Sequence, residues 1–100
     1  LVLQATVMYA MHEMPQAARR RVLRNAMRLA RDSVLIVDIW PGFEPTPMML
    51  SGEPYVLDYL KNMESDIEAS APSSEWDVTR VDVVEEHVRM WKLDRLDFDI

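Results

Sequence analysis

The chain has 100 residues, which is enough for one small domain or for a piece of a larger one. Hydrophobic residues make up 49% and charged residues 28%, which is typical of packed domains and excludes a disordered or membrane-spanning chain. The net charge of −6 argues against nucleic acid as a partner, because phosphate binding needs a basic surface.

The first expected elements are a buried strand and an amphipathic helix. Residues Ala5 to Met11 are nearly all apolar and include β-formers, which indicates a fully buried strand. Pro15 then begins a helix, since proline suits a first turn whose N–H groups have no partner within the helix. Its apolar face contains Val22, Leu23, Ala26, Met27, Leu29 and Ala30. A basic stripe on another face, expected to be solvated, contains Arg20, Arg24, Arg28 and Arg31.

A second buried strand is expected at Val34 to Val37, after a short turn at Asp32 and Ser33. A strand, a helix and a strand with tight connections form a βαβ unit, in which the two strands run parallel. The segment from Trp40 to Gly52 holds both glycines and several prolines. We therefore expect it to be a loop without regular helix or strand.

The second half of the chain predicts a helix followed by a hairpin. The helix begins near Pro54, and a surface loop follows at Ala69 to Ser74. Strands are expected at Trp76 to Val84 and at Val88 to Leu93. Their short connection predicts antiparallel pairing. Residues 94–100 are expected to be a frayed tail.

The candidate site lies where the first two strands end. Ligands of parallel α/β sheets bind outside the carboxyl ends of the strands, and parallel strands place these ends at one edge. Residues far apart in the chain should therefore converge there. These residues are Met11, His12, Glu13, Asp38 and Trp40.

Three of these residues have two interpretations each. His12 could take a proton from an attacking hydroxyl, or it could hydrogen-bond to the backbone of a loop. Asp38 could bind a ligand or orient His12, or it could cap the following loop. Trp40 could line an apolar wall for a flat substrate, or pack the loop onto the sheet edge. The same two interpretations apply to Phe43, Met48 and Met49.

No metal site is expected from the sequence. The chain has no cysteine, and the neighbouring ligand types in Glu85-Glu86-His87 do not converge as zinc requires. The chain has two separated glycines and so lacks a Gly-x-Gly-x-x-Gly loop to clamp a nucleoside. The absence of cysteine fits a reducing compartment, and nothing resembles a signal peptide, so we expect a cytoplasmic protein.

Three stretches resemble class I S-adenosylmethionine-dependent methyltransferases: Tyr9 to Pro15, Arg20 to Arg28, and Val34 to Asp38. They are similar to the family's fourth strand with its His-containing turn, the next helix, and the fifth strand with its acidic end. The later helix and hairpin follow the family's order, so the resemblance covers residues 3–93. One departure is Arg31-Asp32-Ser33, where the family usually has glycines.

The resemblance implies an α/β fold, namely the C-terminal half of a Rossmann-like methyltransferase sheet with parallel strands and a closing antiparallel hairpin. Residues 1–93 would form part of that domain, from its fourth to its final strand, and residues 94–100 a tail. The implied function is methyl transfer from S-adenosylmethionine to a small-molecule acceptor. The implied roles are catalytic for His12, cofactor-binding for Tyr9, Ala10 and Met11, and substrate-binding for Glu13, Asp38 and Trp40.

Two alternatives stay open. The chain could be a non-catalytic interaction module, or an inactive truncated fragment of a larger enzyme. The exposed edge of the first strand would favour self-association, since an unpaired edge invites pairing with another chain. We favour truncation as the interpretation, because strand-like sequence is under way within a few residues of Leu1.

Overall fold

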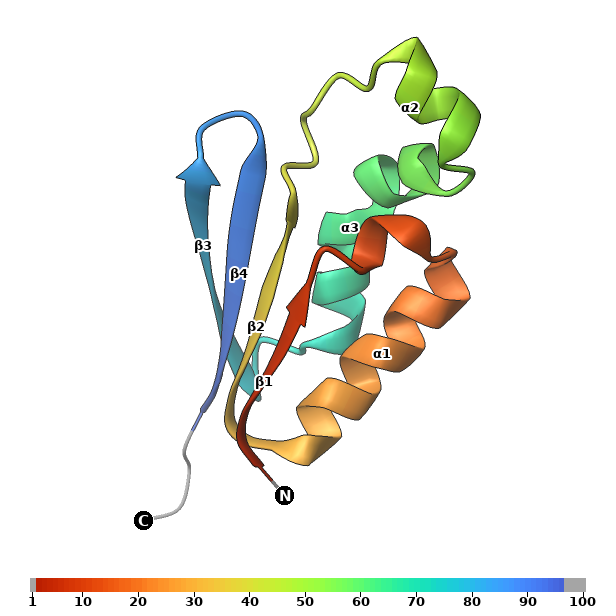
Figure 1. Cartoon of the computed structure of the whole chain (residues 1–100). Helices are drawn as coiled ribbons and strands as arrows, with labels where there is room; N and C mark the ends of the chain where they lie inside the picture. Colours follow the sequence, from red (N-terminus) through yellow and green to blue (C-terminus); the bar gives the residue numbers. More distant parts are fainter. Residues whose placement is uncertain (1, 97–100) are drawn as a thin grey trace.

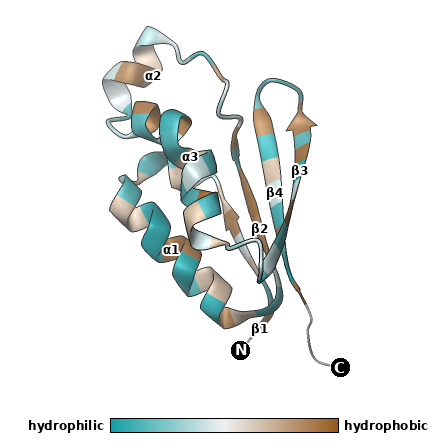
Figure 2. Ribbon diagram, turned by 180° about the vertical axis from the view of Figure 1, so that it is seen from behind, coloured by the Kyte–Doolittle hydropathy of each residue, from teal (hydrophilic) through white to brown (hydrophobic). Residues whose placement is uncertain are grey.

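The computed structural model describes residues 2–96, which form a four-stranded sheet with helices on one face (Figure 1). The strands are β1 (Val2–Met8), β2 (Ala30–Ile39), β3 (Trp76–Val84) and β4 (Val88–Arg95). The helices are α1 (Gln16–Leu29), α2 (Pro47–Gly52), α3 (Val56–Ser70) and the short 3₁₀ helix η1 (Met11–Glu13). Two opposite views show α1 and α3 on the same side of the sheet (Figure 2). Within residues 2–96, no helix combines the length and the apolar character that crossing a bilayer requires.

The first half is the expected parallel unit. β1 and β2 pair in parallel with Ala5 opposite Val34 and Met8 opposite Val37, and α1 connects them. The strand order is β1-β2-β4-β3, so β1 lies at the edge of the sheet. The prediction of a fully buried first strand is therefore wrong, since every residue of β1 is exposed or only partly buried. Because β1 and β2 run parallel, their carboxyl ends meet at one end of the molecule.

The second half closes the sheet with an antiparallel hairpin, as expected. β3 begins and ends where the sequence predicts it, and it pairs with β4 in antiparallel register. β4 also pairs antiparallel with β2, with Trp91 opposite Ile36. The α/β fold with a parallel pair and a closing antiparallel hairpin is thus confirmed.

The core lies between the sheet and the helices α1 and α3. Alternate residues of β2 and β4 face the helices, because side chains alternate between the two faces of a strand. The sheet contributes Val34, Ile36, Trp91 and Leu93, and the helices contribute Leu23, Met27, Tyr59, Met63 and Ile67. Each fully buried side chain of this size contributes about 1.5–3 kcal/mol to stability.

Two boundaries near the site differ from the sequence prediction. β1 ends at Met8 and not at Met11, because Tyr9 adopts a left-handed backbone (φ 55°) and the chain then turns into η1. The predicted turn at Asp32 and Ser33 is also wrong. Helix α1 ends at Leu29 and passes directly into β2, which begins at Ala30.

The predicted loop from Trp40 to Gly52 contains a helix. Pro47 occupies the first turn of α2, and the Thr46 hydroxyl accepts a hydrogen bond from the Met49 N–H at 3.2 Å. This N-cap stabilises the helix despite the nearby prolines and glycines, because it satisfies an N–H that the helix itself leaves unpaired. Helix α3 runs to Ser70 into the predicted loop, and β4 extends to Arg95 into the predicted tail. Residues 97–100 of that tail lie outside the described residues.

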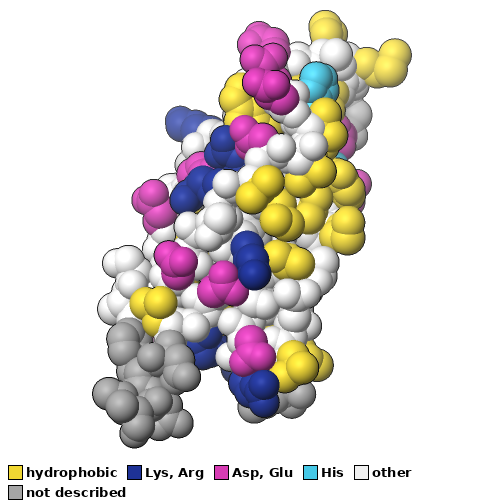
Figure 3. Space-filling view, turned by 90° about the vertical axis from the view of Figure 1, so that its left-hand side faces the viewer, with side chains coloured by type: hydrophobic (Ala, Val, Ile, Leu, Met, Phe, Trp, Pro, Cys, Tyr) yellow, Lys and Arg dark blue, Asp and Glu magenta, His cyan; other side chains and the backbone are white. Residues whose placement is uncertain are grey.

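The sheet face opposite the helices carries an apolar row across all four strands. Met8, Val37, Met90 and Val81 are successive cross-strand partners in this row. Met8 is 58% exposed and Val81 45%. Figure 3 views the molecule from the hairpin side and shows hydrophobic side chains gathered there. In the described part of the chain, no helix covers this face.

Candidate functional site

The candidate site forms at the carboxyl ends of β1 and β2. After β1, the Tyr9 N–H donates to the Val37 carbonyl at 2.8 Å, and the chain then folds into η1. The segment after α2 approaches η1 from the other side. A pocket of about 230 Å³ opens between them, lined by His12, Glu13, Gly52, Glu53 and Pro54.

Asp38 organises this end of the sheet. Its side chain is completely buried at the end of β2. Oδ2 accepts from the backbone N–H groups of Met11 (2.9 Å) and His12 (3.4 Å), and Oδ1 accepts from its neighbour Ile39 (2.8 Å). The carboxylate therefore ties η1 to β2, although the two are more than twenty residues apart in the chain.

His12 lies between two carboxylates. Its Nδ1 is 2.7 Å from Asp38 Oδ1, and its Nε2 is 3.2 Å from Glu53 Oε1. Asp38 can only accept when ionised, so Nδ1 carries a proton and donates to it. Nε2 faces the Glu53 carboxylate and becomes open to chemistry when Glu53 turns away. The His12 side chain is 12% exposed, and its outward nitrogen borders the pocket. Such an imidazole can exchange a proton at Nε2 or bind a cation there.

Tyr59 supports the site from α3. Its buried hydroxyl donates to the Ile39 carbonyl at the end of β2, and its ring meets the His12 ring edge-on at 6.2 Å. Burial raises the pKa of this hydroxyl, and the negative charge of Asp38 raises it further. Tyr59 therefore stays protonated and acts as a fixed hydrogen-bond donor.

The structure brings together some of the predicted site residues. His12, Glu13 and Asp38 converge, and Asp38 orients His12, which is one of the two interpretations of this residue. Tyr9 lies at the sheet edge and is 48% exposed, with Ala10 half-buried beside it. Met11 points into the core and is fully buried, so only its backbone faces this end.

Trp40 does not line this pocket. Its N–H donates to the His87 carbonyl, and its ring lies so close over Gly42 that a Cβ there would be 2.5 Å from it. The neighbouring Phe43 ring tilts against His87 at 5.9 Å. Trp40 and Phe43 thus pack the loop against the hairpin, and Met48 is largely exposed.

Sequence reasoning missed Glu53 and Tyr59. Glu53 follows α2, a helix that the sequence does not predict because of the glycines and prolines in this segment. The sequence therefore gives no reason to expect Glu53 near η1. Tyr59 lies within the predicted helix that begins near Pro54, but no pattern in the sequence places its hydroxyl at the end of β2. The signal that could have found Glu53 is Thr46-Pro47, which is a cap followed by a proline at the start of a helix.

A buried arginine on α1 was also missed. Arg19 is completely buried, and its Nε donates to Asp66 Oδ2 at 2.7 Å. Arg20 and Gln16 donate to the other oxygen of Asp66, each at 2.9 Å. This cluster fastens α1 to α3. Arg20 of the predicted solvated stripe is therefore partly engaged, whereas Arg24 and Arg28 are exposed.

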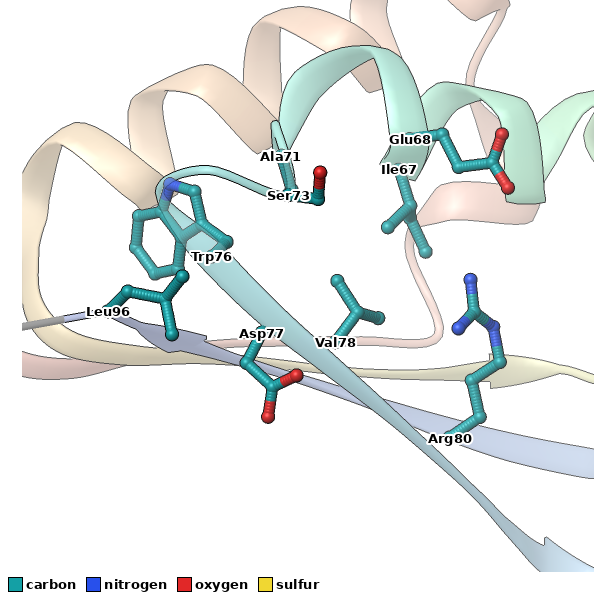
Figure 4. A pocket seen from close by; sticks show the side chains of 9 residues that line it. All are labelled: Ile67, Glu68, Ala71, Ser73, Trp76, Asp77, Val78, Arg80 and Leu96. Atoms are coloured by element: carbon teal, nitrogen blue, oxygen red, sulfur yellow. The ribbon is translucent and has the colours of Figure 1, made fainter.

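A second hollow, of about 470 Å³, lies between the end of α3 and the start of β3 (Figure 4). Its lining residues are Ile67, Glu68, Ala71, Ser73, Trp76, Asp77, Val78, Arg80 and Leu96. The register places Trp76 opposite Arg95, next to the partner of Ser33. The hollow is thus toward the amino ends of β1 and β2, away from His12.

The chain is similar to a known protein in its fold, but no match is found from its sequence. No family model matches the chain, and no curated protein matches it. A solved structure does match: magnesium protoporphyrin IX methyltransferase from Synechocystis PCC 6803 with bound SAH. The TM-score is 0.59 at 12% identity, over 94% of this chain and 45% of that one. This chain has the fold of part of a methyltransferase, and it spans less than half the length of that neighbour.

Proposed function

We propose that this chain is part of a domain that transfers a methyl group from S-adenosylmethionine to a small-molecule acceptor. The observation that carries the proposal is the His12–Asp38 pair at the carboxyl ends of parallel strands, in a chain with the fold of part of a methyltransferase. Ligands of such sheets bind at this end. The neighbour holds SAH, the product that remains after S-adenosylmethionine has lost its methyl group.

The residues at this edge fit one end of the cofactor. Met8 and Tyr9 expose apolar and aromatic surface beside the free edge of β1, and an aromatic face attracts a cation such as a sulfonium. The strand-end carboxylate Asp38 cannot hold a ribose, because it is buried and engaged by His12 and backbone N–H groups. Tyr9, Ala10 and the backbone of Met11 would therefore contact the sulfonium end only. In this proposal, the remaining contacts come from the rest of the methyltransferase domain.

His12 is the proposed proton acceptor. When bound, S-adenosylmethionine supplies an electrophilic methyl group, and an acceptor hydroxyl becomes a better nucleophile as its proton leaves. His12 Nε2 takes that proton, while Asp38 holds Nδ1–H and stabilises the imidazolium that forms. Glu53 must turn away from Nε2 to admit the acceptor, and its partly exposed side chain has room to do so.

Comparing the two histidines tests this role. We expect His12→Ala to lower the rate of methyl transfer by about 10²-fold or more, since a positioned general base contributes this much. The measurement is transfer of labelled methyl from S-adenosylmethionine, with the protein expressed over its whole reading frame. His87→Ala is the matched control and keeps the wild-type rate. A His12→Ala variant as active as the control would overturn the assignment.

A further inference from the structure

The pocket beside His12 gathers three ligand atoms of the kind that hold metal ions. His12 Nε2 and one carboxylate oxygen each from Glu13 and Glu53 lie within 4.8 Å of one another. Ligands that sit 2.0–2.2 Å from one cation are roughly 3–4 Å apart. The 3.2 Å between His12 Nε2 and Glu53 Oε1 already falls in that range. A small inward turn of the exposed Glu13 side chain completes the set.

Asp38 supplies an observation outside this set. A histidine that binds a metal almost always donates its other ring N–H to a carboxylate, which fixes the ring and points the free nitrogen at the ion. Asp38 is buried and holds His12 Nδ1 at 2.7 Å, so Nε2 faces the pocket. The pocket of about 230 Å³ leaves room for further oxygen ligands on the ion.

We propose that His12, Glu13 and Glu53 bind a divalent transition-metal cation such as Mn²⁺. One imidazole and two carboxylates suit this class, because imidazole favours transition metals and carboxylates accept hard divalent ions. A cation at this position also relieves the repulsion between the two glutamates. The sequence does not predict this cluster, because Glu53 is forty residues from Glu13. The metal-ligand types that are adjacent in the sequence, Glu85-Glu86-His87, lie elsewhere.

The consequence for catalysis rests on the proposed function. A cation on Nε2 uses the lone pair that would otherwise take the acceptor's proton. Cation binding and proton transfer therefore exclude each other, and the cation inhibits methyl transfer. Binding itself requires neither cofactor nor acceptor, so it can be measured separately.

The test is titration of the protein with Mn²⁺ alone, followed by the loss of the electron paramagnetic resonance signal of free Mn²⁺. We expect one site per chain. Glu53→Gln and Glu13→Gln should each weaken binding by at least about tenfold, since loss of even an outer partner costs this much. Both side chains are partly or fully exposed, so these variants should fold.

His87→Ala is the control for adventitious binding at the hairpin turn and should keep the wild-type affinity. Absence of Mn²⁺ binding, or binding that survives both glutamine variants, would overturn the metal site. Methyl transfer slowed by Mn²⁺ supports the exclusion argument. Methyl transfer accelerated by Mn²⁺ would leave the cation site standing and overturn the role of His12 as the proton acceptor.

Discussion

At the residue scale, the site depends on one buried carboxylate. Asp38 receives hydrogen bonds from three backbone N–H groups and from the His12 ring, and each of its oxygens serves two donors. The charge is thus matched by donors, which is the condition under which a buried carboxylate is stable. The sequence predicts an aspartate at the end of a buried strand, but it does not predict the four donors, because it extends the first strand over the residues that form η1.

Asp38→Asn should therefore destabilise the fold. The amide keeps one acceptor oxygen and turns an NH₂ group toward donors, so buried N–H groups lose their partner at a cost of about 1–3 kcal/mol. Urea unfolding monitored by circular dichroism measures the change. Asp32→Asn, which breaks only the exposed Arg31 pair, is the matched control and should leave the midpoint unchanged. Equal midpoints for the two variants would show that Asp38 does not hold this end together.

At the element scale, one glutamate joins α3 to the closing hairpin. Glu64 accepts from Arg80 Nε of β3 at 2.8 Å, and from Arg89 Nη1 and Trp91 Nε1 of β4 at 3.0 Å each. Burial alone would raise the pKa of Glu64, but the hydrogen bonds from Arg80 and Trp91 outweigh it and hold the pKa below its ordinary 4.5. The ionised form is thus the form that fastens the helix to the sheet.

The lowered pKa of Glu64 predicts a dependence of stability on pH. Its contribution is fully present above pH 4.5 and is lost as the pH falls through the lower pKa of the folded state. Glu64→Gln should flatten the decline in unfolding free energy between about pH 5 and pH 3. Glu68→Gln, one turn along the same helix, should keep the wild-type slope. Chemical unfolding at a series of pH values measures it, and an unchanged slope in Glu64→Gln would contradict the account.

The elements also show what the sequence could and could not predict. Local periodicity located α1, because its apolar spacing records the face that the helix buries, and the short connection after Val84 predicted the antiparallel pairing of β3 with β4. The parallel ends of β1 and β2 predicted the meeting of His12 with Asp38. The buried Arg19–Asp66 pair and the approach of Glu53 arise from contacts between distant segments. No local pattern encodes such contacts.

At the scale of the whole molecule, two exposed surfaces are suited to contact with another segment or chain, namely the edge of β1 and the sheet face opposite the helices. β1 is an edge strand whose Val2 and Leu3 are more than half exposed, and the sheet face opposite the helices carries the apolar row from Met8 to Val81. Unpaired edges and open apolar faces invite association. We propose that the rest of a methyltransferase domain pairs with this edge; self-association through β1 is the alternative.

The most direct test of the central claim is calorimetric titration with SAH of the protein expressed over its whole reading frame. It needs no knowledge of the methyl acceptor. We predict one SAH per protein, and little binding by residues 1–100 alone, because in our proposal these residues contact only the sulfonium end of the cofactor. Absence of SAH binding to the whole protein would contradict the proposed function, and tight binding by the isolated segment would contradict the division of the site between this chain and the rest.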